Sequence, residues 1–205
     1  MLNRRRFLML AAAVSALAGG PDLVRAEGDA EGFVQSLGDQ AIETLTGPDV
    51  TPAIRAERFR TLLKQNFDVP AIGKTVLGRY WKIATDAERE EYLKLFEDFL
   101  VANYAKRFAE YTGQKFQVRG TRPEGNDLLT VQTLIQTPDG GEPARLDWLL
   151  RDVGTDYKIL DLKIEGISMS ETHRAEFASV IQSSGGKVEG LLDALRNKVK
   201  TLYPS

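Results

Sequence analysis

The apolar residues between Thr85 and Gly113 recur at helical spacing over most of the stretch. Thr85 and Glu88 fit the capping-box pattern, in which each side chain satisfies a backbone N–H of the other residue. Acidic residues follow in the first turns, where they favour the positive end of the helix dipole. The pattern predicts a helix of about seven turns with a wide apolar side, formed by Tyr92, Phe96, Phe99, Leu100, Tyr104, Phe108 and Tyr111.

Three shorter helices are predicted before this one. The first covers residues 29–46 and stops at a Gly-Pro pair. Thr51 can cap the second, which carries Phe59 and Phe67 on its apolar side, and Asp68 can cap the third. A proline follows each of these two caps within the first turn, where its missing N–H costs little. Gly78 ends the third helix.

After Gly113 the pattern changes to alternation, which is typical of strands. Four such runs are separated by turn residues: 115–121, 127–137, 144–151 and 156–165. In the third run, Ala144, Leu146, Trp148 and Leu150 alternate with a mostly charged set, so one sheet face is apolar and the other solvated. The short connections predict an antiparallel meander.

Two more helices complete the chain. Ser168 with Glu171 is a second capping-box candidate, for a helix that extends to Ser184. The last helix, over residues 188–202, is amphipathic. The sum is an α+β fold, a curved antiparallel sheet of about four strands covered by helices.

The first 26 residues have the organisation of an export signal. Three arginines at positions 4–6 precede an apolar run, residues 7–17, that is too short to span a bilayer comfortably. Residues 24–26 form a small-x-small cleavage site, and the arginines also resemble a twin-arginine signal. We therefore expect a cleaved signal peptide at residues 1–26, exported by the Sec or the twin-arginine route, and a single domain at 27–205. An uncleaved anchor is the alternative.

Composition and charge narrow the classes of function. The 205 residues include no cysteine, which excludes disulfides, zinc–thiolate sites and cysteine nucleophiles. Loss of residues 1–26 would remove four of 27 basic and one of 29 acidic residues, and leave a net charge of −5. That balance argues against a nucleic-acid partner and against standing adhesion to anionic lipid surfaces.

No constellation in the sequence predicts catalysis or a metal site. The one histidine, His173, is expected on the surface of a helix and lacks a second metal ligand nearby. Asp147, Asp161 and Glu165 lie on predicted strands near basic residues, which suits either an acid/base pair in a pocket or charge pairing across strands. We favour charge pairing.

Four separated segments carry a resemblance to a known family: FDVPAIGKTVLGRYW, YLKLFEDFLVANYAKRFAEYTGQKF, YKILDLKIEGISMSETHRAEFASVI and GLLDALRNK. In this order they resemble the MlaC family of periplasmic phospholipid-binding carriers, also called toluene-tolerance auxiliary proteins. One branch of that family is associated with hopanoid biosynthesis. The resemblance covers nearly all of the chain after residue 26.

The resemblance implies a nuclear-transport-factor-like or cystatin-like fold with an apolar cavity between sheet and helices. It implies phospholipid or hopanoid as the bound ligand, with no other cofactor, and a periplasmic protein that is a monomer. Its implied partners are an inner-membrane lipid transporter with an MCE component, or an RND-type transporter in the hopanoid branch, and an outer-membrane lipid complex.

A lipid carrier needs a deep apolar slot more than it needs reactive groups. Trp148 is expected to face the helical layer, and Phe96 and Leu100 are expected to face the sheet. The candidate lipid-binding residues are Val76, Leu77, Trp81, Phe96, Phe99, Leu100, Tyr104, Val131, Leu146, Trp148, Leu150, Ile164, Phe177 and Ile181. The same residues would also describe a solid core.

Two other functions stay open on the sequence alone. One is a nuclear-transport-factor-like enzyme that acts on an apolar small molecule. The other is a non-catalytic periplasmic interaction protein with a filled core. Copurified lipid would favour the carrier, and turnover that is lost in Asp161→Asn would favour the enzyme.

Overall fold

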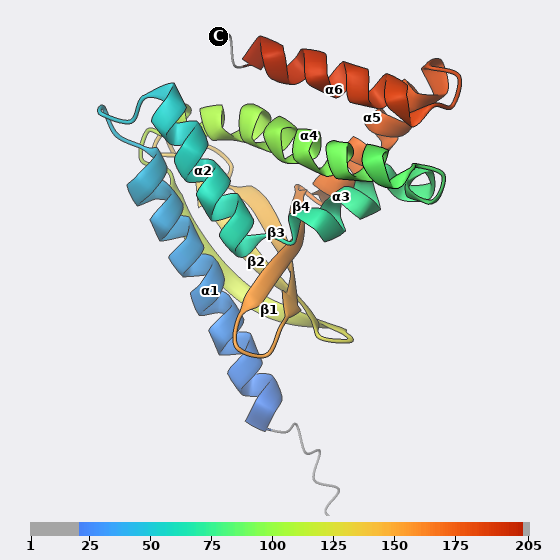
Figure 1. Ribbon diagram of the computed structural model, residues 1–205. Coiled ribbons are helices and arrows are strands. Elements are labelled where there is room, and N and C mark those ends of the chain that lie inside the picture. Colours follow the sequence, from blue (N-terminus) through green and yellow to red (C-terminus); the bar gives the residue numbers. More distant parts are fainter. Residues whose placement is uncertain (1–20, 203–205) are drawn as a thin grey trace, which may run out of the picture.

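The computed structural model describes residues 21–202, which form six α-helices, two 3-10 helices and five strands (Figure 1). The helices are α1 (Pro21–Leu45), α2 (Pro52–Asn66), α3 (Val69–Leu77), α4 (Asp86–Tyr104), α5 (Met169–Ser183) and α6 (Val188–Leu202), with 3-10 helices η1 (Gly78–Lys82) and η2 (Ala105–Glu110). The strands are β1 (Lys115–Gly125), β2 (Leu128–Gln136), β3 (Ala144–Asp152), β4 (Tyr157–Ile164) and β5 (Ile167–Ser168).

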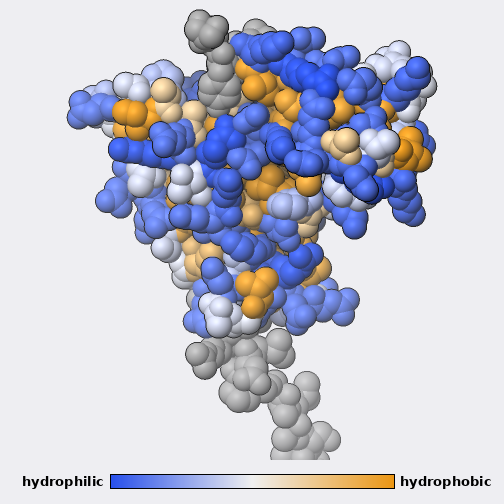
Figure 2. Space-filling view, in the orientation of Figure 1, coloured by the Kyte–Doolittle hydropathy of each residue, from blue (hydrophilic) through white to orange (hydrophobic). Residues whose placement is uncertain are grey.

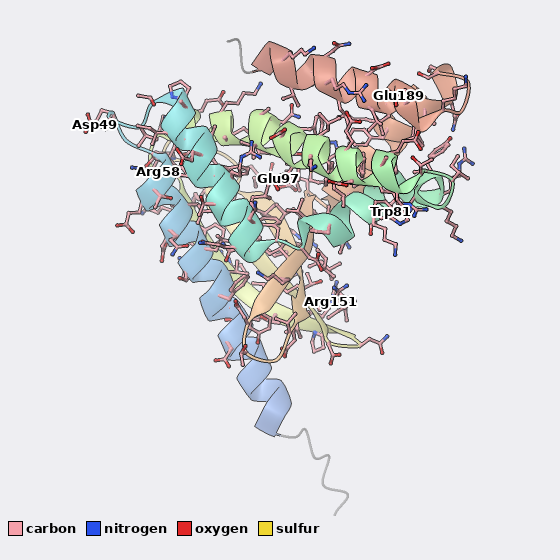
Figure 3. All side chains as sticks on the ribbon, in the orientation of Figure 1. Asp49, Arg58, Trp81, Glu97, Arg151 and Glu189 are labelled. Atoms are coloured by element: carbon pink, nitrogen blue, oxygen red, sulfur yellow. The ribbon has the colours of Figure 1, made fainter. Side chains whose placement is uncertain are left out.

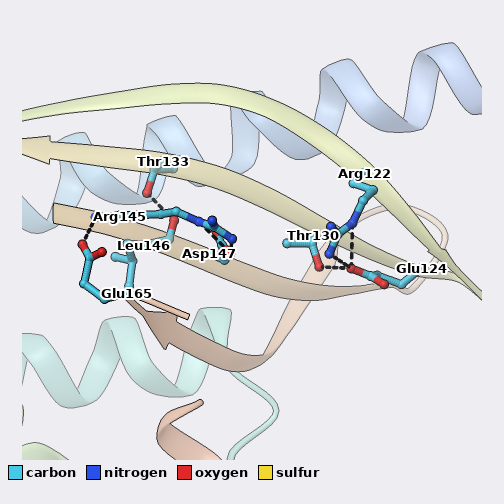
Figure 4. Close-up of polar contacts among 8 residues, drawn as sticks. All are labelled: Arg122, Glu124, Thr130, Thr133, Arg145, Leu146, Asp147 and Glu165. Carbon is cyan, nitrogen blue, oxygen red and sulfur yellow. Dashed lines mark hydrogen bonds and ion pairs between the residues drawn. The ribbon is translucent and has the colours of Figure 1, made fainter. Parts of the chain in front are cut away.

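The strands form one antiparallel sheet in sequence order, so the predicted meander is confirmed. Leu146, Trp148 and Leu150 pair with Ile164, Leu162 and Ile159, which puts these apolar side chains on one face. Register shifts interrupt the β1–β2 and β3–β4 ladders. Such bulges increase the local twist and bend the sheet, as its curvature in Figure 4 shows. The short fifth strand, β5, extends the predicted four.

The helix starts were predictable because their signals are local. The side chains of Thr51, Asp68, Thr85 and Ser168 each accept a hydrogen bond from the backbone N–H of the third residue in the helix that follows. At Thr85 both halves of the capping box are present.

Two predicted helix boundaries were wrong. Helix α1 begins at Pro21, eight residues earlier than expected, and runs through the predicted cleavage site. Residues 1–20, which hold the rest of the predicted signal peptide, lie outside the described residues. Helix α4 ends at Tyr104, and the chain then tightens into η2. The rings of Phe108 on η2 and Phe59 on α2 lie 5.9 Å apart, so tertiary packing sets this end of the helix.

The helices divide between two neighbourhoods. Helix α1 packs along β1, β2 and β3, whereas α4 packs on α6, α3 and α2 (Figure 1). The expectation that Phe96 and Leu100 face the sheet was therefore wrong. Both belong to a core of helical residues that includes Phe177 and Leu192. No helix in the part of the chain that the structure describes has the length and apolar character needed to cross a membrane.

The interior consists of two apolar clusters. The first, which we call the helical cluster, is built mainly from α3, α4, α5 and α6. The second, the sheet cluster, combines Val34 and Leu37 of α1 with Val131, Trp148 and Leu150 of the sheet. Trp148 thus packs towards the helical layer, as expected.

Candidate functional site

Helix α2 lies where the two clusters meet. Its neighbours Leu62 and Leu63 are both buried, but Leu62 belongs to the sheet cluster and Leu63 to the helical cluster. Phe59, and Phe67 just after the helix, pack against both clusters. We call this boundary, marked by Phe59 and Phe67, the inter-cluster seam. In Figure 2 an apolar area shows at the centre of the face, bordered by polar side chains, in the region where α2, α3 and α4 meet in Figure 1.

Charged groups hold α2 against α4 on one side of the seam. The Arg60 guanidinium donates hydrogen bonds to Glu97 and to Asp98, each at 2.7 Å, and Glu97 is labelled in Figure 3. Burial lowers the pKa of Arg60, but its two carboxylate partners outweigh that effect and the pKa lies above its ordinary value. All three side chains remain partly exposed, so water can compete for these bonds.

The end of α2 is attached to the sheet by polar contacts. The Asp68 backbone N–H donates to the Ile159 carbonyl at 3.0 Å, and Phe67 forms an isolated parallel bridge with Ile159. Arg151 pairs with the Asp68 carboxylate at 3.1 Å, and the Lys158 ammonium donates to the Gln65 carbonyl. The end of α2 is therefore attached to the sheet by backbone bonds, whereas α2 is attached to α4 by partly exposed ion pairs.

The apolar face of the sheet reaches solvent at one end. Leu146 is half-buried, and its partner Ile164 is 42% exposed. Ile167 on β5, which pairs with Ile164, is 62% exposed. Tyr104 lies nearby, because its hydroxyl contacts Met169, the residue after β5. An apolar ligand that enters here would meet the sheet face first.

The structure splits the fourteen candidate residues between the two clusters. Val76, Leu77, Phe96, Phe99, Leu100, Phe177 and Ile181 are buried in the helical cluster, with Trp81 and Tyr104 half-buried against it. Val131, Trp148 and Leu150 are buried in the sheet cluster, with Leu146 packed against it, and Ile164 is exposed. The structure does not bring these residues together around one space. Their role in lipid binding, and the predicted cavity, stay predictions.

Trp148 is fixed in place by a polar contact that the sequence did not predict. Its indole N–H donates to the Thr133 hydroxyl at 3.0 Å, and that hydroxyl donates to the Leu146 carbonyl at 2.8 Å. Phe116 packs edge-on against the indole at 6.1 Å. The orientation of a buried indole is fixed when its N–H has a hydrogen-bond partner, so Trp148 is a rigid part of the sheet cluster.

The two seam residues are absent from the fourteen candidates predicted from the sequence. Phe59 and Phe67 were expected on the apolar side of the second helix, but not as lipid-binding residues. No sequence signal marked them, because Phe59, Leu62, Leu63 and Phe67 have the i, i+3, i+4, i+8 spacing of any core-facing amphipathic helix.

The acidic residues of the sheet have structural partners (Figure 4). Asp147 pairs with Arg145 of the same strand at 3.0 Å, and Glu165 accepts the Arg145 backbone N–H. Asp161 accepts the Ser170 backbone N–H at the start of α5. Charge pairing was the favoured interpretation, but the pair lies along one strand rather than across two. Asp147 is only 4% exposed, contrary to the expected solvated face, because the Arg145 side chain covers it.

His173 is not the surface residue that was expected. Its side chain is 13% exposed, and Nε2 lies 2.8 Å from the Tyr104 hydroxyl. Phe99 packs edge-on against the ring at 5.2 Å. Burial raises the pKa of Tyr104. Within the described residues, no group of three or more histidine or acidic side chains is placed to hold a metal ion. His173 therefore joins α5 to the end of α4.

These features define an α+β protein in which a curved antiparallel meander and a set of helices enclose two apolar clusters that meet along one helix. The chain belongs to the MlaC family, since the model of the MlaC protein family matches residues 35–197.

Individual relatives agree with this assignment. The intermembrane phospholipid transport system binding protein MlaC of Haemophilus influenzae is 26% identical over 55% of this chain and 54% of its own length. The toluene tolerance protein ttg2D of Pseudomonas putida is 21% identical over 64% of this chain and 61% of its own length. The chain thus spans between half and two thirds of these relatives.

A solved structure has the same fold. The phospholipid-binding protein of Ralstonia solanacearum, solved in complex with a phospholipid, superposes with a TM-score of 0.71 at 26% identity. The match covers 84% of this chain and 98% of that one.

Proposed function

We propose that this protein binds a phospholipid, with its acyl chains in the inter-cluster seam, and carries it between membranes. The division of the interior into two clusters that share Phe59 and Phe67 supports this most directly. An undivided core would have to break its packing to admit a chain, whereas two clusters can separate along their boundary. The phospholipid complex of the Ralstonia relative supports the choice of ligand.

The seam has to return most of the free energy that a lipid loses when it leaves a bilayer. At about 0.8 kcal/mol per buried CH₂, a sixteen-carbon chain leaves at a cost of roughly 12 kcal/mol. Some side chains at the boundary are only half-buried, namely Phe59, Phe67, Leu146 and Leu162. Their exposed apolar surface can contact a lipid chain without loss of existing packing. We therefore favour these residues, with Tyr104 and Ile164 at the exposed end, as the first contacts of the chains.

Opening of the seam requires α2 and α4 to separate. The bonds from Arg60 to Glu97 and Asp98 are partly exposed, and such ion pairs contribute only about 0–1 kcal/mol each. The sheet end of α2 is held by a backbone bond and a bridge to Ile159. We infer that α2 moves with the sheet and away from α4.

The route of the carrier is part of the same proposal. We propose that the chain is exported, is cleaved near Ala26 and acts in the periplasm, between an inner-membrane lipid transporter and an outer-membrane lipid complex. The names of the Haemophilus and Pseudomonas relatives support a phospholipid transport system. A hopanoid ligand with an RND-type transporter is the variant of this proposal that the resemblance also suggests.

An enzymatic function has less support. The carboxylates that could have formed an acid/base pair are occupied by Arg145 and by the N-terminus of α5.

Mass spectrometry of an organic extract tests the proposal. The protein is purified without detergent, and phospholipid and hopanoid are quantified per protein chain, with a mock purification as control. We expect about one phospholipid per chain, because the proposal gives each chain one binding site. Hopanoid in place of phospholipid would support the hopanoid variant of the proposal. An extract that contains no lipid beyond the mock purification would overturn the proposed function.

A further inference from the structure

A hollow of about 330 Å³ opens at the surface where α3, η1 and α5 meet. Its lining consists of Lys74, Thr75, Gly78, Trp81, Lys82 and Arg174. Three of these are cations, one carries a hydroxyl group and none is acidic. Trp81 marks the place in Figure 3, at the end of the molecule away from α1. This local positive charge contrasts with the formal net charge of −2 for the whole chain.

The cations of the hollow have capacity for a further partner. Lys74 and Lys82 are exposed, and neither makes an ion pair or a side-chain hydrogen bond within the described part of the chain. Arg174 donates through Nη1 to Glu171 at 3.2 Å. A guanidinium has five N–H donors in a planar fork, and the contact with Glu171 engages only Nη1, so Arg174 has N–H donors beyond this one ion pair.

Gly78 shapes the floor of the hollow. Its φ of +57° is in the left-handed region that ends α3, where glycine is favoured. A Cβ at this position would lie 3.0 Å from Nε of Arg174 and 3.5 Å from Cζ. The glycine therefore lets the guanidinium lie against the backbone, within the same hollow as the two lysines.

Trp81, which lines the hollow, connects it to neighbouring aromatic and aliphatic surface. The Arg89 guanidinium lies over the Trp81 ring at 5.5 Å, and Ile83, two residues later, is 65% exposed. A tryptophan and an exposed aliphatic side chain beside several cations are typical of groups that sit at the headgroup level of a bilayer.

We propose that this hollow binds a phosphate group, either the phosphodiester of a phospholipid headgroup at a membrane surface or free phosphate. Arginine and lysine donate charge-assisted hydrogen bonds to phosphate oxygens, and the Thr75 hydroxyl adds a neutral donor. The competing explanation is that the cations only offset the negative end of the α3 dipole. That end carries about half a charge, and of the three cations only Lys74 lies in the last turn of α3. The hollow is separate from the inter-cluster seam, so the inference stands without the proposed function.

The test uses two double variants of the purified protein. Lys74→Glu with Lys82→Glu reverses the charge of the hollow. Lys64→Glu with Lys187→Glu makes the same change in net charge at two exposed lysines elsewhere. Arg174→Gln provides a milder single change, and thermal melts check that all variants fold. The probes are inorganic phosphate, followed in ¹⁵N–¹H NMR spectra, and flotation with vesicles of phosphatidylcholine with or without phosphatidylglycerol.

We expect phosphate to shift the amide signals of Gly78 and Lys82 and the indole N–H signal of Trp81. Binding should weaken at least about tenfold in the Lys74/Lys82 variant, because two cationic donors are replaced by carboxylates that repel the phosphate, and should be unchanged in the Lys64/Lys187 variant. Flotation with anionic vesicles that is lost only in the Lys74/Lys82 variant assigns the site to a headgroup. Phosphate binding without flotation assigns it to free phosphate. The inference is overturned if the two double variants behave alike with both probes.

Discussion

Arg60 on α2 donates a 2.7 Å hydrogen bond to Glu97 on α4, across the boundary between the two apolar clusters. The same guanidinium holds Asp98 at 2.7 Å. Because the contact joins two elements that must separate if a lipid enters the seam, it sets part of the free energy of opening.

Arg60→Met should therefore speed lipid exchange. Loss of a partly exposed ion pair lowers the cost of opening by about 0.5–1 kcal/mol, which corresponds to roughly a two- to fivefold faster transfer. The measurement is the transfer rate of a fluorescent phospholipid from the loaded protein to vesicles. Arg58→Met is the matched control, since Arg58 lies on the same helix and bonds the Thr44 carbonyl at the end of α1 instead. Equal rates in the two variants would mean that the Arg60 contact does not limit opening.

Gly73→Ala should destabilise the helical cluster. A Cβ at Gly73 would lie 2.8 Å from Leu93 Cδ2 and 3.2 Å from Phe96 Cδ1, where α3 approaches α4. Overpacking of this kind costs about 1–3 kcal/mol in the free energy of unfolding, of which the helix propensity of alanine offsets at most about 1 kcal/mol. Gly32→Ala on α1 is the control, because nothing lies within 4 Å of its Cβ position. There the helix propensity of alanine should stabilise by up to about 1 kcal/mol. Chemical denaturation measures both, and a loss of stability in Gly32→Ala alone would contradict the packing described for α3.

Tyr92 should make the protein less stable at high pH. Its side chain is fully buried and donates to the Gly73 carbonyl at 3.0 Å, and burial raises the pKa of its hydroxyl above the ordinary value near 10. Above pH 10 the unfolded chain releases this proton and the folded chain keeps it. The stability that is present below pH 10 is therefore lost as pH rises, by about 1.4 kcal/mol per pH unit.

Tyr92→Phe separates this effect from the loss of the hydrogen bond. At neutral pH the variant should be less stable by about 1 kcal/mol. Between pH 10 and 11 its stability should fall less steeply than that of the unchanged protein. Parallel pH profiles would show that Tyr92 ionises as readily in the folded chain as in the unfolded one.

Features set by neighbouring residues were predictable from the sequence. The caps at Thr85 and Ser168 depend on residues three positions apart. The face of the sheet on which Trp148 lies follows from the alternation of apolar and polar residues within one strand. The order of strands in the meander follows from the short turns between them. The class of fold followed from these local signals.

Features set by distant residues were not predictable in the same way. The apolar side of α4 was recognised, but its partner turned out to be α6 rather than the sheet, and periodicity says nothing about which apolar surface a helix meets. Alternation along the strand predicts that Asp147 is solvated, but its ion pair with Arg145, which buries it, depends on side-chain conformations that the sequence does not give. Phe59 and Phe67 gain their importance only from the two clusters on either side of them.

Photo-crosslinking of a bound lipid tests the central claim most directly. The protein is loaded with a phospholipid that carries a diazirine on one acyl chain, irradiated and digested, and the adducts are mapped by mass spectrometry. We predict adducts in the peptides that contain Phe59, Phe67 and Leu146, and none in the α6 peptide that contains Leu191 and Leu195, which are buried in the helical cluster. Adducts confined to α6, or no adducts above those in the dark control, would contradict the inter-cluster seam as the lipid site.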